Sequence, residues 1–164
     1  MSVFPKRVTY GEYLIMHVLF YNNDPTIKRV KATLEIRKNE KKLMRIFQDK
    51  NFLVPQKGGI ELYYPIKINK KLKPGKYYVS LKMIHNKEGF KSETKLNDFF
   101  YIDSFKIKKE NKFIFIKNLS KENSPIRFVD NKKIKTRIMK PSAKIKINSP
   151  YIIIGNSKII KVKR

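Results

Sequence analysis

Side chains able to carry catalysis or bind metal ions are few in this sequence, and their spacing matches no known site. The chain contains two histidines, His17 and His85, and no cysteine. Without cysteine there are no disulfides, thiolate metal ligands or cysteine nucleophiles. The H-x-H, H-E-x-x-H and D-x-D patterns that hold metal ions are absent from the sequence.

Acidic residues and glycines add no catalytic signal. Glu12, Glu35, Glu40 and Glu61 stand among lysines and are interpreted as ordinary surface charges. The pair Gly58-Gly59 is interpreted as a turn, because a phosphate-binding loop needs a longer glycine-rich pattern. We therefore predict that the protein is not an enzyme and uses no cofactor or metal.

Charge is the most informative property of the chain. Its 164 residues include 39 Lys and Arg against 13 Asp and Glu, a formal net charge of +26. Self-repulsion of this size opposes compaction, so a partner that offsets it is expected. Nucleic acid, an acidic protein surface and anionic lipid are all candidates. Codon bias in an AT-rich genome is the alternative, but it explains abundant Lys and not scarce Asp and Glu.

Basic residues alternate with apolar ones in the C-terminal part of the chain. At a period of two, each set points to one side of its strand, so several strands are expected to build one basic sheet face. The predicted binding residues are Lys106, Lys108, Lys133, Lys135, Arg137, Lys144, Lys146, Lys161 and Lys163. The isoleucines between them, Ile134, Ile138, Ile145 and Ile147, are predicted to face the core.

The nature of the anionic partner is open at this point. Nucleic-acid sites usually combine a basic groove with exposed aromatic rings that stack on bases. Phe113, Phe115, Phe128 and Tyr151 stand in apolar runs and are predicted to lie in the core. Dedicated recognition of nucleic acid is therefore not expected, whereas contact with phosphate without sequence reading stays open beside an acidic protein surface.

Strands are the elements that must position these side chains. Val30, Ala32, Leu34 and Ile36 alternate with polar residues, the pattern of a half-buried antiparallel strand. Pro65 interrupts a second alternating run and predicts an edge strand or a bulge. Further strands are expected at 13–21, 43–48, 60–68, 77–83, 99–102, 105–108, 112–117, 126–129, 133–138, 144–147, 151–154 and 159–163. Turn residues between the N-terminal strands indicate a sandwich.

The composition of the sequence changes near Ser104, after which the predicted strands are shorter and richer in basic residues. Residues 104–164 carry 18 basic and 3 acidic side chains. We predict two domains, a β-sandwich over residues 1–103 and a small basic β domain over residues 104–164. The fold class is therefore all-β.

Two segments resemble known families. The run LKPGKYYVSL from Leu72 to Leu81 resembles the L-x-P-G-x-Y segment of many immunoglobulin-like sandwiches. The C-terminal part resembles small β modules of tailed-phage structural proteins, through FIFIKNLS at 113–120, SPIRF at 124–128 and IMKPSAKIKI at 138–147. Ser142 stands in the last run where glycine is usual. The second resemblance implies a virion component such as an auxiliary capsid, head-decoration or head–tail connector protein. Its partner would then be an acidic protein surface, a repeated lattice of another structural protein.

The prediction is thus a non-catalytic virion assembly protein, made in the host cytoplasm, that docks on an anionic surface. The alternative is a cytoplasmic β-sandwich that binds nucleic acid, a ribonucleoprotein or an anionic glycan. No membrane partner is expected, because the longest apolar run, Leu14 to Tyr21, is far below the ~20 residues that span a bilayer. The first residues also lack a signal-peptide pattern.

Overall fold

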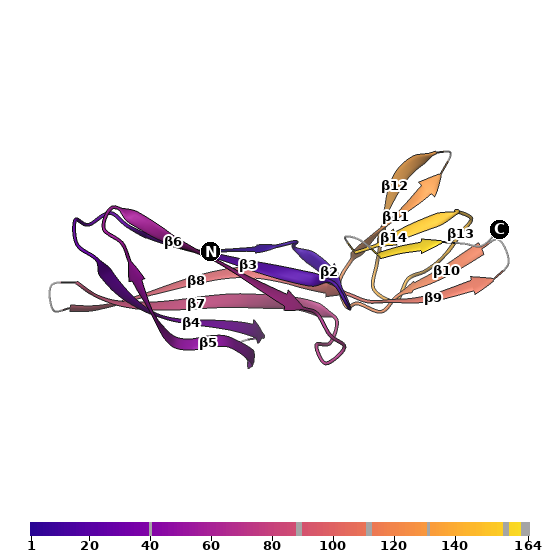
Figure 1. Ribbon diagram of the computed structural model, residues 1–164. Coiled ribbons are helices and arrows are strands. Elements are labelled where there is room, and N and C mark those ends of the chain that lie inside the picture. The colour runs from indigo at the N-terminus through magenta and orange to yellow at the C-terminus, as the bar shows by residue number, and fades with distance from the viewer. Residues whose placement is uncertain (40, 88–89, 111–112, 131, 156–157, 162–164) are drawn as a thin grey trace. The chain divides into compact units, whose positions relative to one another are not determined.

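All regular secondary structure in the described part of the chain is β-strand. The computed structural model describes residues 1–39, 41–87, 90–110, 113–130, 132–155 and 158–161 (Figure 1). Contacts divide it into two compact units that are interleaved in sequence. Unit 1 comprises Met1–Lys6, Ile15–Ile66 and Tyr77–Phe100, and unit 2 comprises Arg7–Leu14, Lys67–Lys76 and Tyr101–Arg164. The domain boundary at 103/104 stays a prediction.

Unit 1 is built from two sheets. One has the order β1 (Ser2–Phe4), β3 (Tyr13–Asn22) and β6 (Gly58–Lys67). The other has the order β2 (Arg7–Thr9), β8 (Phe90–Asp103), β7 (Gly75–Lys87), β4 (Lys28–Lys38) and β5 (Lys41–Val54). The first two residues of β3, the last residue of β6, all of β2, the first two residues of β7 and β8 from Tyr101 belong to unit 2.

Alternation in unit 1 follows the predicted faces. Leu34 of β4 and Leu81 of β7 are Cα partners across the sheet, and both are fully buried. Lys31 and Lys82, which occupy alternate positions, are exposed. Pro65 lies on β6, an edge strand of its sheet, where its missing N–H leaves no gap inside a ladder.

Unit 2 contains the remaining strands, drawn in orange to yellow in Figure 1. One sheet has the order β13 (Lys144–Ile147), β10 (Phe113–Asn118) and β9 (Phe105–Glu110). The other has the order β12 (Lys133–Met139), β11 (Ser124–Asp130), β14 (Tyr151–Ile154) and β15 (Lys158–Lys161). The core between them contains Ile114, Ile116, Ile126, Met139, Ile147, Ile152 and Ile154.

In each unit, a buried asparagine at the end of a strand makes the same set of hydrogen bonds to the backbone. At the end of β3, the Asn22 Nδ2 lies within hydrogen-bond distance of the carbonyl oxygens of Thr26, Val54 and Pro55, and its Oδ1 accepts the Asp24 N–H. At the end of β10, the Asn118 side chain makes the equivalent set of bonds, to the carbonyl oxygens of Glu122, Met139 and Lys140 and from the Ser120 N–H. Both side chains are buried, and these bonds give their polar atoms partners inside the protein. The two units therefore share one local architecture, and the predicted fold class, an all-β immunoglobulin-like sandwich followed by a second, smaller β module, is confirmed.

The sequence did not predict strands β1 and β2 or the first half of β8. The first two have only three residues each, too few for a periodic pattern. Residues 90–98 read FKSETKLND, in which apolar side chains are rare. The segment is nevertheless part of a strand, because β8 lies between β2 and β7 in its sheet.

Candidate functional site

A row of lysines crosses the outer face of the β13-β10-β9 sheet. Lys117 on β10 is the Cα partner of Lys106 on β9 and of Lys144 on β13. The next row on the same face consists of Lys108, Phe115 and Lys146 in the same strand order. We call the five lysines of the two rows, together with Phe113 and Phe115, the lysine face.

Local sequence explains why these side chains face outward. Ile114 and Ile116 alternate with them along β10 and are buried in the core of unit 2. The four lysines of β9 and β13 are exposed, while Lys117 on the central strand is half-buried. They surround a depression of about 640 Å³. Structure thus brings Lys106, Lys108, Lys144 and Lys146 onto one face, and adds Lys117, which sequence reasoning missed although it continues the alternation of β10.

Two phenylalanines predicted to lie in the core belong instead to the lysine face. Phe113 and Phe115 are half-buried, on the side of β10 opposite Ile114. The Lys146 Nζ lies 3.7 Å from the centroid of the Phe113 ring and 5.8 Å from that of Phe115. An ammonium over the ring face is favourable, and it occupies the surface on which a base would stack. Of the other two aromatics, Phe128 packs against the core, and Tyr151 is 39% exposed.

Electrostatic repulsion is built into this face. Like charges directly opposite one another in a sheet are destabilising, and the Lys106–Lys117–Lys144 row contains two such pairs. The carboxylate of Glu110 forms an ion pair with Lys108 on the same strand. Within the row, the cross-strand partners of the three lysines are lysines and not acidic residues. Its arrangement therefore suits an anion more than it suits the stability of the fold.

The other predicted basic residues do not join the lysine face. Lys133, Lys135 and Arg137 lie on β12, in the opposite sheet of unit 2, on the side shared with Ile126 and Phe128. Lys135 pairs with Asp130 at 2.5 Å. Lys161 is exposed on β15 opposite Tyr151. Lys163 lies outside the described residues.

The predicted orientation of β12 was wrong. Ile134 and Ile138, expected in the core, are 64% and 59% exposed. Their Cα partners are Val129 and Pro125, on the side of β11 that faces away from the buried Ile126. Alternation alone does not distinguish the two faces of an edge strand when both contact solvent, and all of β12 before Met139 is exposed. By contrast Ile145 and Ile147 do pack in the core, as predicted.

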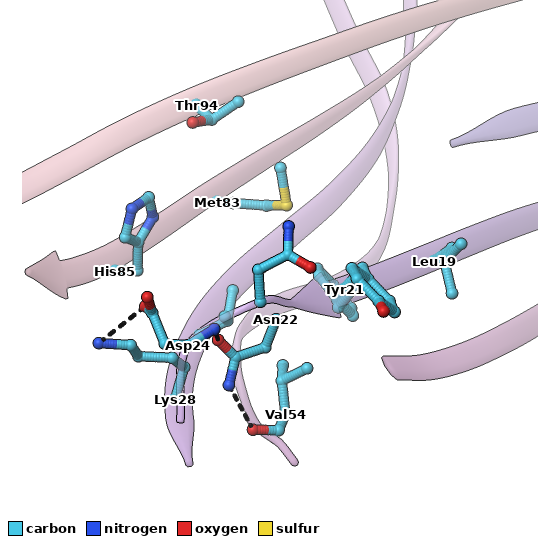
Figure 2. A pocket seen from close by; sticks show the side chains of 12 residues that line it. Leu19, Tyr21, Asn22, Asp24, Lys28, Val54, Met83, His85 and Thr94 are labelled. Carbon is cyan, nitrogen blue, oxygen red and sulfur yellow. Dashed lines mark hydrogen bonds and ion pairs between the residues drawn. The ribbon is translucent and has the colours of Figure 1, made fainter. Parts of the chain in front are cut away.

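A second hollow lies in unit 1, between its two sheets. It has a volume of about 430 Å³, and Figure 2 shows its side chains from close by. Leu19, Asn22 and Tyr21 come from β3, and Met83, His85 and Thr94 come from β7 and β8 across the gap. At its rim, Lys28 Nζ lies 3.1 Å from an Asp24 carboxylate oxygen. His85, which follows the strand predicted at 77–83, lies inside β7 and lines this hollow.

His17 belongs to a cluster that superficially resembles a catalytic triad. Its Nδ1 lies 3.3 Å from the Ser2 Oγ, and its Nε2 lies 2.7 Å from the Glu61 Oε1 without hydrogen-bond geometry. The imidazole stacks on Tyr63, whose hydroxyl donates to Glu61; that hydrogen bond raises the pKa of Tyr63. Acyl transfer also needs oxyanion donors in a water-excluded site, and none of the hollows described here contains these residues. We interpret the cluster as a structural contact joining β1, β3 and β6.

Other acidic residues have structural partners. Glu35 is an exception to the predicted surface carboxylates, since its side chain is only 13% exposed and pairs with Arg37 and Arg45. In unit 2, Arg7 forms a two-bond pair with the buried Asp103, which also accepts the Ser124 hydroxyl. Among the described residues, no three His, Asp or Glu side chains come together as metal ligands would. The described part of the chain also includes no helix with the length and hydropathy of a membrane span.

Comparisons with known proteins identify a fold. No protein-family model and no curated protein matches the chain. Among solved structures, the E. coli chaperone DraB matches 99% of this chain and 95% of its own at 10% identity, with a TM-score of 0.37. A complex of the Salmonella enterica SafA pilin with the SafB chaperone matches 98% of this chain and 94% of the other, at 11% identity and a TM-score of 0.37. Likeness at this level shows the fold alone.

One similar structure is an enzyme. The Pseudomonas fluorescens alkylpurine DNA glycosylase AlkC, bound to DNA with an abasic-site analogue, matches 63% of this chain at 15% identity and a TM-score of 0.43. This chain spans only 29% of the glycosylase. The match is therefore to a β part of a larger protein.

The predicted virion function was wrong, and so were the virion, capsid and bacteriophage assignments and the location in a virion or host cytoplasm. Solved structures that match along nearly the whole chain include chaperones of fimbriae biogenesis, such as the class 5 chaperone CfaA at 99% coverage of both chains. The resemblance of residues 113–147 to phage modules did not identify the function. Strand spacing and the P-x-x-x-I-x-I run at 141–147 report the fold and not the assembly in which it works.

Proposed function

We propose that this protein is a non-catalytic binding module whose lysine face docks on an acidic surface of another protein. The observation that carries the proposal is the cross-strand row Lys106–Lys117–Lys144. Three cations in register repel one another in the free protein, and an acidic partner relieves that repulsion when it binds.

A protein partner fits this face better than nucleic acid. Lys146 covers the ring of Phe113 at 3.7 Å, so the aromatic surface that bases need is already occupied. Half-buried phenylalanines beside exposed lysines also match the usual anatomy of a protein interface, an apolar centre with a charged rim. Two of the similar solved structures are described as complexes with protein subunits, a pilin and a tip adhesin; those descriptions concern those proteins.

Charge reversal of the central row tests the proposal. A variant with Lys106→Glu, Lys117→Glu and Lys144→Glu is compared with a control in which Lys41, Lys70 and Lys71, all exposed elsewhere, are replaced by Glu. The net charge changes equally in both. We expect the face variant to lose at least about tenfold in affinity for poly-L-glutamate, measured by calorimetry at 0.1 M salt, and the control to lose much less. Equal losses in the two variants would mean that net charge, and not the face, binds the anion.

A parallel titration with a thymidine oligonucleotide separates the two partner classes. Oligonucleotide binding that is tighter than poly-L-glutamate binding, falls log-linearly with salt, and is abolished only in the face variant would assign the face to nucleic acid. That result would overturn the proposal.

A further inference from the structure

The edge of β3 in unit 1 is only partly paired. Strand β1 pairs with it at Ser2–His17, Val3–Met16 and Phe4–Ile15 and extends no further. In the described sheet order β1-β3-β6, no other strand lies on that side of β3. Residues Val18 to Asn22 therefore present an unpaired strand edge.

The free edge carries hydrogen-bonding groups that point outward. A Cβ added to Gly59 of β6 would lie 2.9 Å from the Phe20 carbonyl oxygen, so this carbonyl points towards β6, and only glycine permits the close approach. The backbone groups of consecutive residues alternate between the two edges of a strand. Those of Leu19 and Tyr21 consequently point to the edge that β1 leaves open.

Core-facing positions opposite this edge are only partly covered. On β7, Tyr77, Val79 and Leu81 are buried, but Met83 and His85, which continue the same face, are only half-buried. On β8, Phe100 is buried, whereas Leu96, at an alternate position, is 37% exposed. The 430 Å³ hollow shown in Figure 2 lies where these partly covered positions meet β3. Unit 1 thus has the groove of a missing strand beside β3.

We propose that this groove binds an extended segment of a partner protein, which pairs with Val18–Asn22 in line with β1 and places apolar side chains at alternate positions in the hollow. This is strand addition to a sheet edge, in which backbone bonds supply affinity and side-chain pockets supply selectivity. The occupant continues a ladder that β1 has already begun, and the wall that receives it is apolar at Phe20, Val54 and Met83. A second copy of this chain is a poor occupant, because each copy has a net charge of +26.

The register of β1 supplies a sharp test. Ser2 is the Cα partner of His17, so the same antiparallel register places Met1 opposite Val18. Four residues added before Met1 would then lie opposite Leu19 to Asn22. Val3 faces the core, so every second residue before it should also face the core. The matching extension is therefore valine, threonine, valine, threonine, with the valines at the core-facing positions. We expect this extension to fill the groove and raise the melting temperature, while a glycine–serine extension of equal length leaves it unchanged.

The binding probe is a labelled octapeptide of alternating valine and serine, which has no charge to attract the lysine face. We expect the wild type and the Lys106/Lys117/Lys144 charge-reversal variant to bind it alike, and the valine–threonine extension to weaken binding at least about tenfold. A control peptide of the same composition, with its four valines together and its four serines together, should bind poorly, because it cannot place valines at alternate positions along the groove. Amide exchange should show protection of Leu19 and Tyr21 on binding.

Three results would overturn the inference: no binding to the wild type at millimolar peptide, binding that the valine–threonine extension leaves intact, or a dimer in sedimentation whose Leu19 and Tyr21 amides are already protected. The last would assign the edge to a second copy. Because the probe is uncharged, its failure leaves the proposed role of the lysine face standing, and the reverse also holds.

Discussion

Ser142 has a backbone conformation that is unfavourable for a side chain. Its φ is +60°, in the left-handed region, at the turn between β12 and β13. A Cβ in that region costs roughly 1–2 kcal/mol, whereas glycine adopts it freely. Serine in place of the usual glycine at position 142 therefore strains the backbone locally.

Ser142→Gly should therefore stabilise unit 2. Relief of the strain exceeds the extra chain entropy that glycine loses on folding, and we expect a gain of about 0.5–1 kcal/mol. Urea denaturation of the two proteins measures it. Ser142→Ala keeps the Cβ and serves as the control; a gain of the same size in that variant would contradict the role assigned to φ.

Lys117 links stability to binding, because it repels a lysine on each side. Lys117→Glu replaces two like-charge pairs by two opposite-charge pairs, each worth roughly 0.2–1 kcal/mol. We expect a protein more stable by about 1 kcal/mol that nevertheless binds poly-L-glutamate more weakly. Thermal denaturation and calorimetry on the same sample measure both. Lys117→Gln should have a stability between those of the wild type and Lys117→Glu. Unchanged stability in Lys117→Glu would mean that the three ammonium groups are too far apart to repel, and a loss of stability would contradict the prediction.

At the scale of elements, a single carboxylate holds β1 against β8. The Asp98 side chain accepts the Val3 N–H at 2.7 Å and pairs with Lys6 at 2.5 Å. Burial by itself would raise the pKa of Asp98, but the hydrogen bonds from Lys6, Phe99 and Val3 and the Lys6 charge outweigh it and lower the pKa below its ordinary 3.8. The ionised form is therefore the one that the folded state favours.

Acid should weaken this attachment. A carboxylate with a lowered pKa stabilises the fold above its unfolded pKa of 3.8, and that contribution is lost as pH falls through the lower folded value. We expect the wild type to lose more stability than Asp98→Asn between about pH 4 and pH 2.5, with Lys6→Gln intermediate. Urea midpoints measured across this range test it. Parallel curves for the wild type and Asp98→Asn would show that Asp98 does not couple β1 to pH.

At the scale of the whole molecule, charge is unevenly divided. The segments of unit 2 contain 24 of the 39 basic residues and five of the 13 acidic ones. Unit 1 has the more balanced composition and the open apolar groove. The protein thus offers two chemically different surfaces, one electrostatic and one formed by a strand edge, and salt should weaken binding at the first far more than at the second.

Much of the fold was predictable because side-chain alternation along a strand is local. Val30 to Ile36 and Tyr77 to Leu81 alternate as covalent geometry requires, whatever strands lie beside them. The same is true of Lys106, Lys108, Lys144 and Lys146, whose outward direction follows from buried isoleucines in the same two strands and on β10. The all-β class, the immunoglobulin-like sandwich and a basic outer face were therefore determined by the sequence itself.

Tertiary structure alone decided which strands are neighbours and which face of each is covered. Strand order places Lys117 between Lys106 and Lys144, puts Phe113 and Phe115 beside them, and sends Lys133, Lys135 and Arg137 to another sheet. The exposed Ile134 and Ile138, and the open edge beyond His17, depend on where β12 and β1 end relative to their partners. These features arise from contacts between residues far apart in the chain, and a period of two along a single strand carries no information about them.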